Sequence, residues 1–272
     1  MIKLYNLANL LIKKSYILTV IAAGALFIFC GSDKANAVDI TAGAISWCAW
    51  GEQKSAGANP DTVMESDPAF LFGPTLSVKF SENFNLTFVF LYGKFNFKDK
   101  DDVYSKFKAK RSDADLALNY RLNGYLKIFA GAKYLSFDMA QVEYAYGPGA
   151  ADISVNDGKH EFIGAGLGLS ATFPIAQNLF LLATLSGFSG WGTEKVDVKG
   201  SKNFSFDAGI NDFGVNSNLS LAYYITSAST VISLGGRYQY FKTKYDEKQF
   251  FPVSIKNTIY GVTLSASYSF DL

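Results

Sequence analysis

The sequence contains a single histidine, His160, and two aspartates at alternate positions, Asp113 and Asp115. Histidine is the side chain that most often serves as a general base near neutral pH, and paired carboxylates can position a water molecule for hydrolysis. Two residues before the histidine stands Gly158 instead of an acid, and no serine stands two residues to either side. The sequence therefore predicts that His160 is structural or exposed, that the aspartates form a solvated or salt-bridged pair, and that the chain has no catalytic residue.

Residues that could bind a metal or a phosphate group are few. One histidine and the distant cysteines Cys30 and Cys48 leave mainly carboxylates as ligands. The acidic segment 99–102 (DKDD) could hold calcium, although such a loop is usually only hydrated. The Gly-x-Gly-x-Gly pattern at 164–168 lies inside an expected strand and lacks the helix that follows a phosphate-binding loop. We therefore expect no metal and no cofactor.

The first 37 residues have the organisation of an export signal. Lys13 and Lys14 precede an apolar run at 16–29, and Ala35-Asn36-Ala37 matches the small-x-small pattern of a signal-peptidase site. The run is shorter than the roughly 20 apolar residues that a spanning helix needs. The sequence predicts a signal peptide at 1–37 and one domain at 38–272, with an uncleaved anchor as the alternative.

A second alternative is a lipoprotein acylated on Cys30, although Phe29 stands where lipoproteins have a small residue. Cleavage after residue 37 removes four lysines and one aspartate, which changes the formal charge from +1 to −2. Such a balance argues against a nucleic-acid partner. Cys48 is then the only cysteine, so no intramolecular disulfide can form.

Apolar and polar residues alternate along most of the chain after residue 38, as expected for strands with two different faces. The pattern predicts ten strands, at 39–50, 69–81, 84–97, 109–122, 125–139, 160–173, 178–191, 205–225, 230–243 and 257–270. Four links are short, at 82–83, 123–124, 174–177 and 226–229. The other links are long and polar, at 51–68, 98–108, 140–159, 192–204 and 244–256. Short and long links alternate throughout.

This alternation of links favours an outer-membrane barrel, which has short periplasmic turns, long outer loops and an even number of strands. A soluble sandwich has no reason to keep every second link short, and its polar face would carry long charged side chains. Here the face opposite Leu167 consists of Gly164, Gly166, Gly168 and Ser170, and the face opposite Phe88 includes Thr87. The bulky faces are therefore expected to contact lipid.

Aromatic residues mark both ends of the expected strands, where their amphipathic rings suit the level of the lipid headgroups. One girdle would lie by the short turns, with Phe80, Phe84, Tyr120, Tyr125, Phe173, Phe180, Tyr223, Tyr224, Tyr268 and Phe270. The other would lie toward the long loops, with Trp47, Trp50, Tyr92, Trp191, Tyr238 and Tyr240.

The mature chain thus resembles Gram-negative outer-membrane β-barrel proteins. The last residues, TLSASYSFDL, resemble the C-terminal signal read by the barrel-assembly machinery, with Tyr268 and Phe270 as its spaced aromatics and Thr263 upstream. Ser265 stands where that family usually has glycine, and the chain ends in Asp271-Leu272 instead of phenylalanine.

This resemblance implies an all-β, transmembrane, antiparallel up-and-down barrel in the cell outer membrane. Its partners would be outer-membrane lipid and, during insertion, the assembly machinery. Ten strands are expected and eight are the alternative, because 39–50 has no clear phase and 178–191 is apolar on both faces. Pro74 lacks a ladder donor and should mark an irregularity in its strand.

The aspartate pair also resembles that of the omptin surface proteases, which are ten-stranded barrels. The resemblance implies that such carboxylates act together with an Asp-His couple. At the sequence level this couple is missing here, because Gly158 occupies the position two residues before His160.

The remaining candidates are charged residues on the inward faces, predicted to line the lumen: Lys79, Asp113, Asp115, Arg121, Lys127, Lys133, Asp212 and Arg237. They could border a narrow aqueous path, with an excess of basic groups that favours anions, or they could fill the lumen with salt bridges. The sequence therefore predicts a small low-conductance channel or a structural, surface-displaying barrel. The alternatives are a barrel enzyme, omptin-like or acting on lipid, and a soluble periplasmic barrel that binds a small ligand.

Overall fold

The computed structural model describes residues 38–56, 62–100, 106–144, 153–199, 204–246 and 254–271. Residues 1–37, which contain the expected signal peptide, lie outside these ranges. Within them, no helix is long and apolar enough to cross a membrane.

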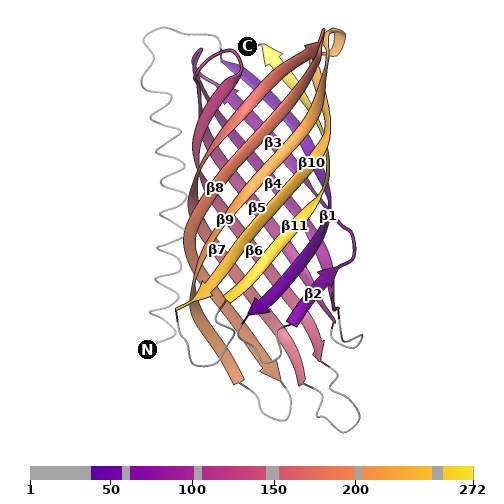
Figure 1. The fold of residues 1–272 in the computed structure, drawn as a ribbon, viewed down its shortest axis with the longest axis vertical. Helices are drawn as coiled ribbons and strands as arrows, with labels where there is room; N and C mark the ends of the chain where they lie inside the picture. The colour runs from indigo at the N-terminus through magenta and orange to yellow at the C-terminus, as the bar shows by residue number, and fades with distance from the viewer. Residues whose placement is uncertain are drawn as a thin grey trace.

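The described residues form one antiparallel sheet that closes into a barrel (Figure 1). The elements are β1 Asp39–Ala56, β2 Thr62–Ser66, β3 Ala69–Lys79, β4 Phe84–Asp99, β5 Lys106–Arg121, β6 Leu126–Tyr144, β7 Ile153–Ala176, β8 Leu179–Lys199, β9 Phe204–Ile225, β10 Thr230–Tyr245 and β11 Ser254–Asp271, with a short 3₁₀ turn, η1, at Thr226–Ala228. Strands β3 to β11 pair with their neighbours in sequence, and β1 pairs with both β11 and β3. This pairing closes the ring.

The ring has ten strand positions, because β2 and β3 occupy the same one. Both pair with β1 and with β4, and β2 lies toward the end that carries the long links. Asp67 and Pro68 separate the two strands. Proline offers no donor to a ladder, which explains the break. The expectation of a ten-stranded antiparallel barrel is confirmed, and the eight-stranded alternative is wrong.

Several strands run further than predicted, mostly at the long-loop end. The predicted strand 160–173 corresponds to β7 at Ile153–Ala176, and 109–122 corresponds to β5 at Lys106–Arg121. These extensions contain charged residues, and the sequence pattern assigns them to polar loops. Pairing with the neighbouring strands satisfies their backbone groups all the same.

The short link predicted at 123–124 connects β5 to β6 through residues 122–125, and Asn123 does not have a positive φ angle. The Asn123 side-chain oxygen accepts hydrogen bonds from the backbone N–H groups of Tyr125 (2.8 Å) and Leu126 (2.9 Å). This side chain organises a four-residue connection, as asparagine commonly does in turns. Among the described non-glycine residues, positive φ occurs at Asn178 and Ser229, both in other short connections.

The outward face of the barrel is apolar, and the phases expected for its main strands are confirmed. Exposed outward side chains include Phe70, Phe72, Phe88, Leu118, Leu167, Leu169, Leu185, Leu219, Leu234, Val262 and Leu264. The β3–β4 ladder lacks the pairs that Gly73 and Pro74 would form, as expected from the missing proline donor.

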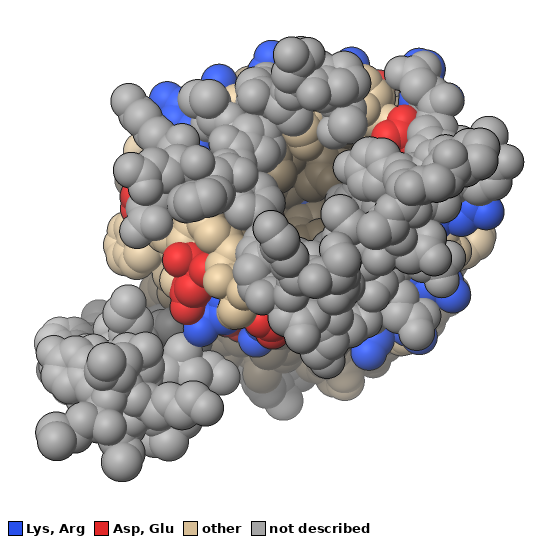
Figure 2. Space-filling model, turned by 90° about the horizontal axis from the view of Figure 1, so that it is seen from below, with Lys and Arg blue, Asp and Glu red and all other residues tan. Residues whose placement is uncertain are grey.

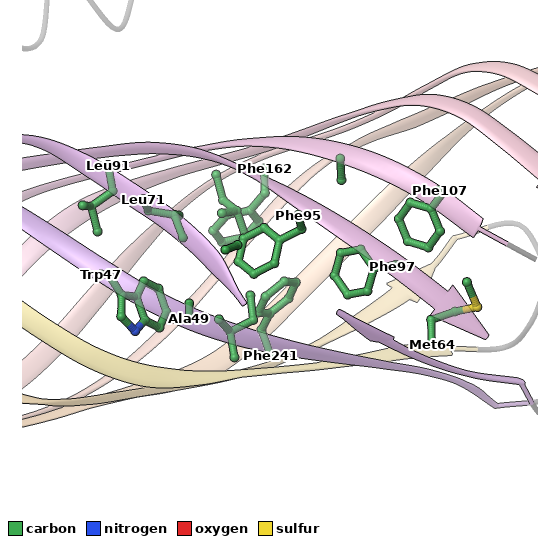
Figure 3. Packing of buried hydrophobic residues seen from close by; sticks show 14 of the residues in the cluster. Trp47, Ala49, Met64, Leu71, Leu91, Phe95, Phe97, Phe107, Phe162 and Phe241 are labelled. Atoms are coloured by element: carbon green, nitrogen blue, oxygen red, sulfur yellow. The ribbon is translucent and has the colours of Figure 1, made fainter. Parts of the chain in front are cut away.

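The interior of the long-loop half is a packed apolar core (Figure 3). Trp47, Leu71, Phe95 and Phe241 each have no exposed surface, and Phe162 is 1% exposed. The assignment of Trp47 to an outer aromatic girdle is therefore wrong. This residue belongs to the inward phase of β1, which the mixed alanine and tryptophan pattern had left open.

Candidate functional site in the barrel interior

A central charge cluster lies directly against the apolar core. It comprises Arg111, Asp113 and Asp115 from β5, Lys133 from β6, and Arg237 and Gln239 from β10. Asp113 accepts a hydrogen bond from Arg111 at 2.6 Å and contacts Lys133 at 2.5 Å, while Lys133 also contacts Asp115 at 2.9 Å. Arg111 donates a further hydrogen bond to the side-chain oxygen of Gln239. Three cations thus surround two carboxylates.

Aromatic rings enclose the cations of this cluster. The Arg111 guanidinium lies 5.5 Å from the centre of the Trp47 ring and 5.2 Å from that of Phe137. The Arg237 guanidinium lies 4.6 Å from the Trp47 ring centre. Cations gain energy over aromatic faces, particularly where water is excluded. The cluster and the core therefore form one packed layer across the lumen.

An inner cavity of about 310 Å³ lies between this cluster and the short-turn end of the barrel. Asp115, Lys133 and Arg237 border it on one side. Its walls mix hydroxyl and amide groups with apolar surface, from Ile45, Thr87, Val89, Asn119, Phe129, Ser170, Thr184, Ser186, Phe188, Asn216, Asn218 and Thr263 among others. Gly166 and Ser170, two of the small inward residues noted in the sequence, line the cavity, and their small side chains leave room for it.

A second cavity of about 310 Å³, the mouth cavity, lies at the short-turn end. Its charged lining residues are Asp39, Lys79, Glu82, Arg121 and Lys127. The two cavities meet at a hydrogen-bonded group of side chains. Asn119 donates to Thr87 at 3.1 Å, and Asn85, in the wall of the mouth cavity, donates to the same hydroxyl at 3.3 Å.

His160 belongs to a separate acidic cluster toward the long-loop end. Its Nε2 lies 3.0 Å from Asp212 of β9, and its Nδ1 lies 3.2 Å from Glu194 of β8. The Tyr245 hydroxyl donates to Glu194 at 2.8 Å. The expectation that His160 has no acidic partner is therefore wrong. Its partners come from β8, the strand next to β7, and from β9, the strand after that, and spacing along one strand cannot reveal such contacts.

The geometry limits what His160 can do chemically. Because ionised carboxylates only accept hydrogen bonds, both ring nitrogens must carry a proton when Asp212 and Glu194 are charged. The His160 side chain is 8% exposed and adjoins a cavity of about 30 Å³. Phe137 lies between this cluster and the central one, with its ring centre 6.2 Å from His160 and 5.2 Å from Arg111.

No family model and no curated protein matches the sequence. Among solved structures, the outer membrane protease OmpT from Escherichia coli superposes with a TM-score of 0.53 at 12% identity, covering 88% of this chain and 98% of that one. The translocator domain of the autotransporter NalP from Neisseria meningitidis gives a TM-score of 0.43 at 11% identity, covering 95% and 98% of the two chains. The beta domain of the Bordetella autotransporter BrkA gives 0.45 at 8% identity, covering 87% and 100%.

The chain has the outer-membrane β-barrel fold. The match to OmpT over 88% of this chain, together with the closed ten-position ring, establishes this fold. At 12% identity, the similarity to OmpT shows a shared fold and does not show a shared activity.

Within this outer-membrane β-barrel fold, the structure divides the sequence-predicted charged residues into three groups. Asp113, Asp115, Lys133 and Arg237 form the central cluster; Lys79, Arg121 and Lys127 line the mouth cavity; and Asp212 joins His160. The aromatic pair Tyr268 and Phe270 points outward near the short-turn end, with ring centres 4.6 Å apart.

Sequence reasoning did not single out Arg111, Gln239 or Glu194. The first two share the inward phase of predicted residues, since Arg111 stands two positions before Asp113 and Gln239 two after Arg237. Extending the same alternation would have found both. Glu194 lay in a segment interpreted as a loop. Within the described residues no group of metal-binding side chains is close enough to hold an ion, and the acidic segment 99–102 lies partly outside them.

Proposed function

We propose that this protein is an integral outer-membrane barrel with a closed lumen, acting as a structural, surface-displaying barrel and not as an open channel. The outward belt of exposed leucine, valine and phenylalanine side chains supports a lipid-facing wall. Short turns would face the periplasm and long loops the outside, as in other barrels of this fold.

The packed layer across the lumen carries this proposal. Trp47, Leu71, Leu91, Phe95, Leu135, Phe162, Phe241, Arg111, Asp113 and Gln239 are each 0–1% exposed. A side chain with so little accessible surface leaves no room for water beside it, so ions would have no hydrated route past the layer. Figure 2 looks into the barrel from the long-loop end, and the floor of its central hollow shows uncharged residues.

The absence of catalytic activity is also part of the proposal. A general base must be able to accept a proton and reach a substrate. His160 is enclosed between two carboxylates, and the Asp113–Asp115 pair is held by Lys133. Phe137 stands between the two clusters, which disfavours a shared water molecule of the omptin kind.

Planar-bilayer recording of the purified, refolded protein tests the closed lumen. We expect no single-channel steps from the wild-type protein. A Trp47→Ala/Phe241→Ala variant removes two rings from the layer and should produce small steps. The control is Phe213→Ala, at an outward position that is 42% exposed, which should remain silent. Wild-type currents equal to those of the double variant would refute the proposal.

A further inference from the structure

We propose that the inner cavity is a binding site for a small organic anion, a carboxylate on an apolar body, which enters from the short-turn end. An anion site here would exist whether or not the lumen conducts ions. The inference therefore goes beyond the closed barrel and can fail independently of it.

The charged side of the inner cavity supplies the anion-binding groups. Lys133 and Arg237 border the cavity together with one carboxylate, Asp115, while Asp113 lies behind them and is shared with Arg111. The whole central cluster holds three cations and two carboxylates, so it carries one uncompensated positive charge. A charge enclosed in a low-dielectric wall attracts a counter-ion more strongly than the same charge in water does.

Arg237 is the residue placed to bind the anion directly. Its Nη2 atom lies 3.6 Å from Asp113 and 3.7 Å from Asp115, which is too far for a hydrogen bond to either. The stack on Trp47 holds the guanidinium in position, and 11% of the side chain remains exposed. Guanidinium groups bind carboxylates through two parallel hydrogen bonds. A pre-positioned guanidinium whose ion pairs with the described carboxylates are long can therefore accept a ligand carboxylate.

The rest of the cavity fits the body of such a ligand. Its volume of about 310 Å³ falls at the lower end of the range for small-molecule sites, roughly 300–1,000 Å³. Phe129, Phe188, Val89 and Ile45 provide apolar surface, while hydroxyl and amide groups of the other walls offer orienting hydrogen bonds. Such a combination of apolar walls with a few placed polar groups is the usual composition of a ligand site.

The entrance has the same charge preference. Among the described residues, the mouth cavity is lined by Lys79, Arg121 and Lys127 against Asp39 and Glu82, again one positive charge in excess. Lys79 pairs with Asp39 at 2.7 Å, which leaves the other two cations facing a single carboxylate. Charge of one sign along an entrance raises the local concentration of the oppositely charged solute. Anions are therefore favoured at both the entrance and the end of this path.

Calorimetric titration of the full-length mature barrel in detergent tests the site, with benzoate as the probe and benzyl alcohol as its neutral counterpart. We expect saturable binding of benzoate and at least about tenfold weaker binding of the alcohol, a difference of roughly 1.4 kcal/mol. Arg237→Gln should weaken benzoate binding about tenfold or more, because the partner of the carboxylate is lost.

Asp115→Asn separates an electrostatic site from a merely structural effect. This substitution removes the one carboxylate that borders the cavity within the described part of the chain, so benzoate should bind more tightly than to the wild type. A loss of packing would weaken binding in both variants. Lys195→Gln, at an outward and exposed position, should change nothing. Equal affinity for benzoate and the alcohol, no binding to the folded wild type, or weaker binding to Asp115→Asn would each overturn the proposal.

Discussion

At the scale of single residues, the interior combines a packed apolar core with buried charges. Asp113 is 1% exposed and contacts two cations, Arg111 and Lys133, at hydrogen-bond distance. Removing one member of a buried ionic group leaves the others without compensation, which costs far more than the loss of a solvated pair. The single carboxylate of Asp113 therefore holds together cations from two strands.

We expect Asp113→Ala to lower the free energy of unfolding by about 3–5 kcal/mol, the range measured when one partner of a buried pair is removed. Urea titration of the protein refolded in lipid vesicles, followed by tryptophan fluorescence, measures the change. The matched control is Asp207→Ala, which breaks an exposed pair with Lys195 and should cost less than about 1 kcal/mol. Equal losses in the two variants would mean that the central cluster contributes no more than a surface ion pair.

At the scale of elements, each strand separates two environments. On β4 the outward Phe88 is 36% exposed, whereas its neighbour Thr87 lines the inner cavity and accepts hydrogen bonds from Asn85 and Asn119. The side-chain period of 2 places adjacent residues on opposite faces of the wall. Placing the same residue at position 87 or 88 therefore compares its effect in the lumen with its effect on the lipid face, at the same depth in the membrane.

Phe88→Arg should destabilise the folded barrel in bilayers by about 2–4 kcal/mol, because an arginine on the lipid face near the midplane must be desolvated. Thr87→Arg should cost less, because its side chain enters a cavity that already contains polar groups. The yield of refolding into vesicles, read from the heat-dependent mobility of folded barrels on gels, compares the two. Similar defects would contradict the assignment of the two faces.

At the scale of the whole molecule, the final strand completes the ring. Tyr268 in β11 is paired with Ala42 in β1 and with Thr230 in β10, so this strand joins the first and last parts of the chain. Both Tyr268 and Phe270 point outward and are 44–45% exposed. Because these two rings point outward, the assembly machinery could contact them before β1 and β11 pair, as expected for the C-terminal signal that this strand resembles.

We expect a Tyr268→Ala/Phe270→Ala variant to be depleted from the outer-membrane fraction and degraded in the periplasm, because the assembly machinery would no longer recognise the last strand. Immunoblotting of fractions washed with carbonate and high salt measures this, and the wild-type protein should remain in the outer-membrane pellet. Tyr223→Ala removes a comparably exposed ring from β9, near the same end of the barrel, and should leave the level unchanged. A normal amount of the double variant in the outer membrane would contradict the role of Tyr268 and Phe270 as an assembly signal.

The sequence alone determined the approximate positions of the strands, the faces of most of them and the expectation of a ten-stranded barrel, because these follow from local alternation and from the lengths of adjacent links. It also placed Asp113, Lys133 and Arg237 on inward faces. The inward phase of β1 and the choice of ten strands over eight required the structure. Two further features also required the tertiary structure. Trp47, Phe95, Phe162 and Phe241 fill the lumen from four different strands, and His160 meets Asp212 and Glu194 across two strand pairings. Contacts across a barrel depend on strand tilt and on closure, and neither is encoded in the spacing along any one strand.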